Sequence, residues 1–190
     1  RWLAEKDLEQ GDDPLDKIEK EKRVARVIPY VQDSRNALVY RPEGEMDKVT
    51  LMSVAYALKQ GIQAEFQLED SELGTEFLPD DTDPREVLFY EAAEGGAGVL
   101  KRFVRDQDAL ARVARAALDI CHFEPNTGED MRRPKGASED CEAGCYECLL
   151  SYYNQRDHRL VDRQLLPDLL KAWSAGQVET TPALRSRSEH

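Results

Sequence analysis

The four cysteines of this chain follow the spacing C-x19-C-x3-C-x2-C, at Cys121, Cys141, Cys145 and Cys148. A structural zinc ion is bound tetrahedrally by four ligands, several of which usually lie on tight local turns. The C-x3-C-x2-C triplet supplies three thiols from eight residues, and Cys121 supplies the fourth from the end of a preceding segment. The spacing therefore predicts one structural zinc ion bound by these four thiols.

Two alternatives to a four-thiol zinc site must be weighed. A pair of disulfides requires an oxidising compartment, but the sequence shows no signal peptide, and we expect a cytoplasmic protein. A histidine could also replace one thiol. His122 directly follows Cys121, however, and adjacent residues rarely both reach one metal, while His158 lies ten residues after Cys148. We therefore expect thiol ligands only, with no position open for a catalytic water.

Charge is distributed unevenly along the chain. Of the net charge of −12, residues 1–100 carry −11, from 23 acidic and 12 basic side chains, and residues 101–190 carry −1. Because an acidic surface repels phosphates, any contact with DNA is expected in the second half. The acidic loop at Asp80, Asp81 and Asp83 could instead bind a basic protein partner. No apolar run approaches the length of about 18 residues needed to span a membrane, so no membrane partner is expected.

The hydrophobic pattern predicts an α+β fold, with a single mixed sheet flanked by helices and a four-cysteine, zinc-stapled helical end. We predict strands at residues 27–31, 37–40, 64–68, 75–78 and 87–90. We predict helices at residues 47–62, 99–105, 108–121, 148–153 and 162–173.

Composition divides the chain into three parts. Residues 1–23 are charged lead-in or linker helices, residues 24–173 form the zinc-binding domain, and residues 174–190 are a polar linker toward a further domain.

A glycine-rich corner containing Gly95, Gly96 and Gly98 follows the last predicted strand. The backbone N–H groups of such a turn can bind a phosphate. Here Glu91 and Glu94 would repel an anion, and no G-K-[ST] sequence follows. The favoured interpretation is therefore that the glycines allow a helix to pack closely on the sheet.

The same two glutamates raise a distant alternative, a metal-dependent nuclease. Glu91 and Glu94 could combine with Asp33 or Asp157 to bind Mg²⁺. The chain has no D…E-x-K pattern that would support hydrolysis, so no catalytic residue is predicted.

Aromatic, amide and basic side chains are concentrated just after the last cysteine. Such a set can stack on bases and bind phosphates. Equally, the tyrosines could pack in the core while the polar groups satisfy helix ends. The residues that we predict to contact DNA or a partner are Tyr153, Asn154, Gln155, Arg156, His158, Arg159 and Arg163.

Three motifs in this order resemble the MrfA-type zinc-binding domain over about residues 24–173. They are YVQDSRNALV at 30–39, LFYEAAEGGAGVL at 88–100 and CEAGCYECLLSYYNQRDHRLVDR at 141–163. Two features depart from the family. The segment Glu91-Ala92-Ala93-Glu94 stands where the family often has aspartate and proline, and the 122–140 insertion separates the first cysteine further from the triplet.

The resemblance implies a domain that lies C-terminal to superfamily 2 helicase cores, in DNA-repair helicases and in the phage-defence proteins DrmA, DrmB and Druantia-type helicases. In that family the zinc cysteines correspond to Cys121, Cys141, Cys145 and Cys148. The implied function is that of an accessory domain, which positions DNA or another defence-complex subunit beside an ATP-driven helicase core. The chain has no Walker A lysine and no DEAD or DEAH box, so we expect no enzyme activity of its own. The main alternative is a docking module that binds protein and not DNA.

Overall fold

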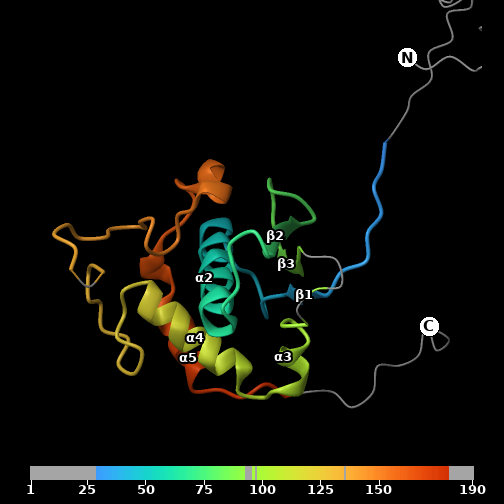
Figure 1. The fold of residues 1–190 in the computed structure, drawn as a ribbon. Helices are drawn as coiled ribbons and strands as arrows, with labels where there is room; N and C mark the ends of the chain where they lie inside the picture. Colours follow the sequence, from blue (N-terminus) through green and yellow to red (C-terminus); the bar gives the residue numbers. More distant parts are fainter. Residues whose placement is uncertain (1–28, 93–95, 97, 135, 180–190) are drawn as a thin grey trace, which may run out of the picture. The chain divides into compact units, whose positions relative to one another are not determined.

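The computed structural model describes residues 29–92, 96, 98–134 and 136–179 (Figure 1). The predicted helices at 1–23 and most of the predicted linker at 174–190 lie outside these residues. The chain divides into two compact units, Arg1–Ser34 and Arg35–His190. The predicted domain boundaries at residues 23 and 173 stay predictions. The elements below all belong to the second unit.

The sheet has three strands, β1 (Ala37–Tyr40), β2 (Leu73–Leu78) and β3 (Glu86–Glu91), in the order β1-β3-β2. Both pairings are antiparallel, with Leu38 opposite Phe89 and Thr75 opposite the same Phe89. The α+β class is confirmed, but the sheet in the described residues is antiparallel and not mixed.

Two predicted strands are not strands in the structure. Of the predicted strand 27–31, the structure describes residues 29–31, and these belong to no strand. Tyr30 and Val31 are 85% and 96% exposed, so neither side chain is buried as a core strand requires. Residues 64–66 continue the preceding helix, α2 (Lys48–Phe66), which ends at Gln67 in the left-handed conformation. A short apolar run cannot be distinguished from the end of a buried helix by its pattern alone.

The carboxylate of Asp47 caps α2 by accepting a hydrogen bond from the N–H of Thr50 at 3.0 Å. Three further helices and two 3₁₀ helices follow. They are α3 (Arg102–Arg105), α4 (Ala109–Ile120), η2 (Tyr152–Asp157), η3 (Arg163–Leu165) and α5 (Pro167–Ser174). The starts of α2 and α4 and the end of α3 lie within a residue of the predicted positions. However, α2 extends beyond the predicted end at 62, α3 begins after the predicted start at 99, and the predicted helix 162–173 is a 3₁₀ turn followed by an α-helix.

The zinc-stapled end is therefore built of turns and 3₁₀ helix and not of the predicted α-helix at 148–153. Ser151 starts η2 with a capping box, because its hydroxyl accepts from the N–H of Tyr153 and Asn154 accepts from the N–H of Ser151. Such a cap begins a new helical segment, so the chain between Cys148 and Ser151 stays a turn.

Figure 1 shows α2 between the sheet and α4, and α4 packed between α2 and α5. Gly61 makes the α2–α4 contact close, since a Cβ there would lie 2.6 Å from the carbonyl oxygen of Val113. The core includes Leu51, Phe89, Val113 and Leu170, all fully buried. This packing fixes the C-terminal end of α4, where the metal centre begins. No helix within the described ranges is long and apolar enough to cross a membrane.

Candidate metal centre

Helix α4 ends in a Schellman turn whose left-handed position is occupied by His122. The N–H of His122 donates to the carbonyl of Asp119 at 3.0 Å, and the N–H of Phe123 donates to that of Leu118 at 2.9 Å. His122 has φ = 64°, a conformation in which glycine is usual and a side chain costs of the order of 1 kcal/mol. The histidine side chain at this position therefore calls for a functional explanation.

The C-x3-C-x2-C triplet forms two tight turns. The N–H groups of Cys148 and Leu150 both donate to the carbonyl of Cys145 at 3.0 Å. The N–H of Cys145 donates in return to the sulfur of Cys148 at 3.1 Å. A hydrogen bond of this kind favours the charged form of a sulfur, as metal binding requires.

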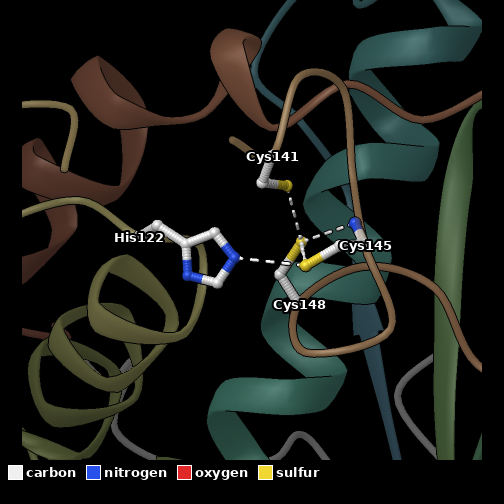
Figure 2. Close-up of side chains that lie close together, drawn as sticks. All are labelled: His122, Cys141, Cys145 and Cys148. Carbon is white, nitrogen blue, oxygen red and sulfur yellow. Dashed lines mark hydrogen bonds between the residues drawn. The ribbon is translucent and has the colours of Figure 1, made fainter. Parts of the chain in front are cut away.

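Four side chains converge where α4 ends against this loop: His122, Cys141, Cys145 and Cys148 (Figure 2). Their ligand atoms lie within 4.8 Å of one another. The sulfur of Cys148 is 3.7 Å from that of Cys141 and 3.6 Å from that of Cys145, and Nε2 of His122 is 3.3 Å from the sulfur of Cys145. Zn–S bonds of about 2.3 Å and Zn–N bonds of about 2.0 Å give tetrahedral edges of about 3.5–3.8 Å, so these residues fit one zinc ion.

The sequence prediction and the structure differ at one member of the set. Cys121 is fully buried in the hydrophobic core and is not part of the group of four, whereas its neighbour His122 is. Cys121 is the C-cap residue of α4, and the next residue, His122, adopts the left-handed conformation. The side chains of Cys121 and His122 therefore point in different directions. The sequence signal that could have pointed to His122 is the presence of a residue other than glycine directly after the end of a predicted helix.

Burial sets the protonation of the metal-free site. It raises the pKa of Cys121 to about 12 and, together with the neighbouring thiols, raises the pKa values of Cys141 and Cys148. Burial also lowers the pKa of His122, which keeps the imidazole neutral and able to bind a metal. Zinc binding at these thiols therefore displaces protons.

Arg163 joins the two segments that supply the metal ligands. Its side chain is 1% exposed, and it donates to the carbonyl of Cys141 at 2.8 Å and to that of Cys121 at 3.2 Å. It also donates to both carboxylate oxygens of Asp130, at 2.7 and 3.1 Å. Its guanidinium carbon lies 5.1 Å from the centre of the Phe123 ring. Arg163 was predicted as a contact residue, but its burial removes it from the surface.

The other predicted contact residues fall into two groups. Asn154 is buried and donates to the carbonyl of Leu149 at 2.7 Å, so it also belongs to the interior. His158 is half-buried, with Nε2 3.0 Å from Oδ1 of Asn154. Four predicted residues are exposed: Tyr153, Gln155, Arg156 and Arg159. Tyr152, 77% exposed, lies beside Tyr153 with the two ring centres 5.7 Å apart.

The glycine corner is filled by Glu91. This carboxylate is buried and accepts from the N–H groups of Gly98 at 2.8 Å and Leu100 at 2.9 Å, and from the Asn36 amide at 3.0 Å. Burial alone would raise its pKa, but these hydrogen bonds outweigh burial and lower it. A Cβ on Gly96 would lie 1.9 Å from the same carboxylate. The N–H groups that could bind a phosphate are thus used internally; Gly95 is outside the described residues.

These contacts also weaken the nuclease alternative. Glu91 is enclosed by its own hydrogen-bond donors, and the carboxylate of Asp157 accepts from the hydroxyl of Tyr56. Glu94 lies outside the described residues.

Comparison with known proteins agrees with this site. The model of the MrfA Zn-binding domain family matches residues 54–149, which include all four converging side chains. The Druantia protein DruE of Escherichia coli (strain UMEA 4076-1) is 26% identical over 163 residues, covering 82% of this chain but 8% of DruE. The chain thus spans a small part of that relative's length. No solved structure matches the chain significantly. Because the family model covers half of the chain, this protein belongs to the MrfA Zn-binding domain family, and it carries one structural zinc site.

Proposed function

We propose that His122, Cys141, Cys145 and Cys148 bind the zinc ion. The distances between their ligand atoms support this set, as does the left-handed conformation of His122, which directs its ring toward the sulfur atoms (Figure 2). The four-cysteine set predicted from the sequence is the competing assignment, and it differs only in exchanging His122 for Cys121.

Two single substitutions separate these assignments. His122→Gly relieves the left-handed backbone, which alone would stabilise the protein by about 1 kcal/mol. If His122 is a ligand, the variant instead contains less than one zinc per chain and unfolds at a lower temperature. Cys121→Ala is the matched control and is expected to retain one zinc per chain by elemental analysis. The opposite pattern, with zinc retained by His122→Gly and lost by Cys121→Ala, would establish the four-cysteine set.

We infer that the domain positions DNA beside the ATP-driven motor of a larger helicase-type phage-defence protein. The observation that supports this function most directly is an exposed surface made of two tyrosines, a glutamine and two arginines next to the zinc loop, residues 141–148. We call it the tyrosine–arginine surface; it consists of Tyr152, Tyr153, Gln155, Arg156 and Arg159. Exposed aromatic rings stack on bases, and arginines bind the phosphates between them.

The zinc site gives this surface a fixed backbone. The capping box at Ser151 starts η2 only three residues after Cys148, and the buried amide of Asn154 ties η2 to Leu149. A surface that is already ordered loses little conformational entropy on binding. The structural zinc would thus hold the contact residues in place without taking part in chemistry.

The defence role rests on the similarity to the Druantia protein DruE and on the family resemblance. The motor and any partner subunit would lie in other parts of a longer protein or complex. A role in DNA repair is the other setting that the family resemblance suggests, and it places the same demands on this surface.

Replacing both arginines tests the DNA-binding role. Arg156→Ala with Arg159→Ala is expected to weaken binding of labelled DNA and to reduce the slope of log K against log salt by about 1.4 for a single strand. Arg41→Ala with Arg85→Ala removes the same charge from two other exposed arginines and should change binding little. Fluorescence anisotropy at several salt concentrations gives both quantities. Equal losses in the two double variants, or no DNA binding by the wild type, would favour the protein-docking alternative.

A further inference from the structure

A cavity of about 290 Å³ opens beside the tyrosine–arginine surface and shares Tyr153 with it. Its walls come from α2, β2, β3 and η2, which places it where the helix, the sheet and the zinc-supported segment meet. The residues that matter for its chemistry are Lys59, Asp70, Thr75, Glu76 and Tyr153.

Two of the three charged groups that line the cavity, Lys59 and Asp70, form an ion pair. Lys59 is 8% exposed, and its ammonium lies 2.5 Å from Oδ1 of Asp70. The amide of Gln63 donates to the same oxygen at 3.1 Å. The remaining carboxylate, Glu76, is exposed. Since Glu76 would repel a phosphate and the ammonium of Lys59 is already paired with Asp70, the cavity excludes a phosphate and can admit a neutral polar group.

One wall carries a polar group with no partner. Oγ1 of Thr75 is buried and has no hydrogen-bond partner, the single such side-chain atom found in the described part of the chain. A buried hydroxyl left unpaired is unfavourable, and it can both donate and accept. The edge of a nucleobase offers donors and acceptors side by side, so a base inserted here could satisfy this hydroxyl once the Thr75 side chain turns toward the cavity.

At the cavity, Tyr153 presents an aromatic ring that is held in place but still open. The ammonium of Lys59 lies 5.6 Å from the ring centre, and the edge-on contact with Tyr152 orients the ring from another side. Tyr153 nevertheless remains 67% exposed. A fixed, exposed ring is suited to stacking on a flat partner.

We propose that this cavity receives one unpaired base of single-stranded DNA, whose phosphates lie outside on Arg156 and Arg159. The inference rests on the proposed DNA-binding function and specifies its substrate. A base in a duplex must first be unpaired and unstacked before it can enter, whereas a base in a single strand is free to do so. The domain therefore prefers single strands to duplexes.

The test uses the full zinc-loaded chain and a short oligothymidine containing one 2-aminopurine, whose fluorescence falls on stacking. Wild-type protein is expected to bind this strand at least about tenfold more tightly than the corresponding duplex and to quench the fluorescent base. Tyr153→Ala should weaken binding about tenfold and abolish quenching, with an unchanged salt slope, while Tyr153→Phe retains both. Thr75→Val, which removes an unpaired hydroxyl without changing the volume, should keep the fold and weaken binding several-fold.

The outcomes separate this inference from the function on which it rests. If DNA binding depends on Arg156 and Arg159 but not on Tyr153 or Thr75, and duplex binds equally well, the base-binding cavity is excluded and DNA positioning stands. Failure of the wild type to bind any DNA excludes both. If an arginine-rich peptide binds instead and Tyr153→Ala prevents it, the cavity is a docking site for a protein partner and the inference is overturned.

Discussion

Cys148→Ser is expected to release the zinc ion and to unfold the segment between His122 and Arg163. Cys148 is fully buried, and its sulfur contacts the sulfur atoms of Cys141 and Cys145. The same sulfur accepts a hydrogen bond from the N–H of Cys145. The binding energy of a structural zinc is of the order of 10 kcal/mol in peptides and acts as folding energy. A serine hydroxyl does not replace a thiolate as a zinc ligand.

Elemental analysis and thermal unfolding measure this effect, and hydrogen exchange locates it. Exchange should become fast across the zinc loop and η2, while α2 and its contacts with α4 and β3 remain protected because they form the hydrophobic core. Glu142→Gln is a suitable control, since Glu142 lies between two ligands but is exposed. It should retain one zinc and the wild-type melting curve. A Cys148→Ser protein that keeps stoichiometric zinc would contradict the proposed site.

Local signals in the sequence predicted those elements that depend on local chemistry. The cap at Asp47 located the start of α2, because capping is a short-range interaction. The apolar run at 87–90 located β3, because β3 is the central strand of the sheet and none of its residues is exposed. The zinc triplet was recognised for the same reason, since three ligands lie within eight residues.

The sequence was least informative where a contact between residues far apart in the chain decides how a side chain is placed. Whether His122 or Cys121 faces the triplet depends on the backbone conformation at the end of α4, and spacing carries no information about it. Arg163 stands between the polar residues Asp162 and Gln164 in the sequence, and its burial is explained by partners far along the chain, the carboxylate of Asp130 and the carbonyls of Cys121 and Cys141. Similarly, the sequence could not show that Glu91 accepts hydrogen bonds from the glycine corner, because this contact forms only when the corner folds back over the carboxylate.

Arg163→Met is expected to be the most destabilising change outside the metal ligands. The substitution keeps an apolar stem of similar length but leaves the carboxylate of Asp130 without its two charge-assisted bonds. It also leaves the carbonyls of Cys121 and Cys141 without this donor. Removing one partner of a fully buried ion pair typically costs about 3–5 kcal/mol, and because the side chain of Asp130 is 33% exposed we expect a loss at the lower end of this range. Urea unfolding monitored by circular dichroism should show the loss, together with weaker zinc retention in a chelator titration.

Two companion variants show why the arginine is needed. Arg163→Lys keeps the charge but not the planar fork, so it should recover only part of the stability. In Asp130→Asn the amide can still accept hydrogen bonds from Arg163, but the buried guanidinium loses its counter-charge, so we expect a loss similar to that in Arg163→Met. If Arg163→Met unfolds at the wild-type urea concentration, the buried arginine does not hold the two ligand segments together.

Acid should remove the contribution of this ion pair in a defined pH range. Burial opposes ionisation of Asp130, but the hydrogen bonds from Arg163 and Gln164 outweigh it and lower its pKa to about 2. Since the folded pKa lies below the unfolded value of about 3.9, the stabilisation is complete above that value and is lost as the pH falls toward 2. The difference in unfolding free energy between wild type and Asp130→Asn should therefore be constant near neutral pH and narrow below about pH 4. A difference that stays constant to about pH 3 would show that the carboxylate is not the group stabilised by Arg163.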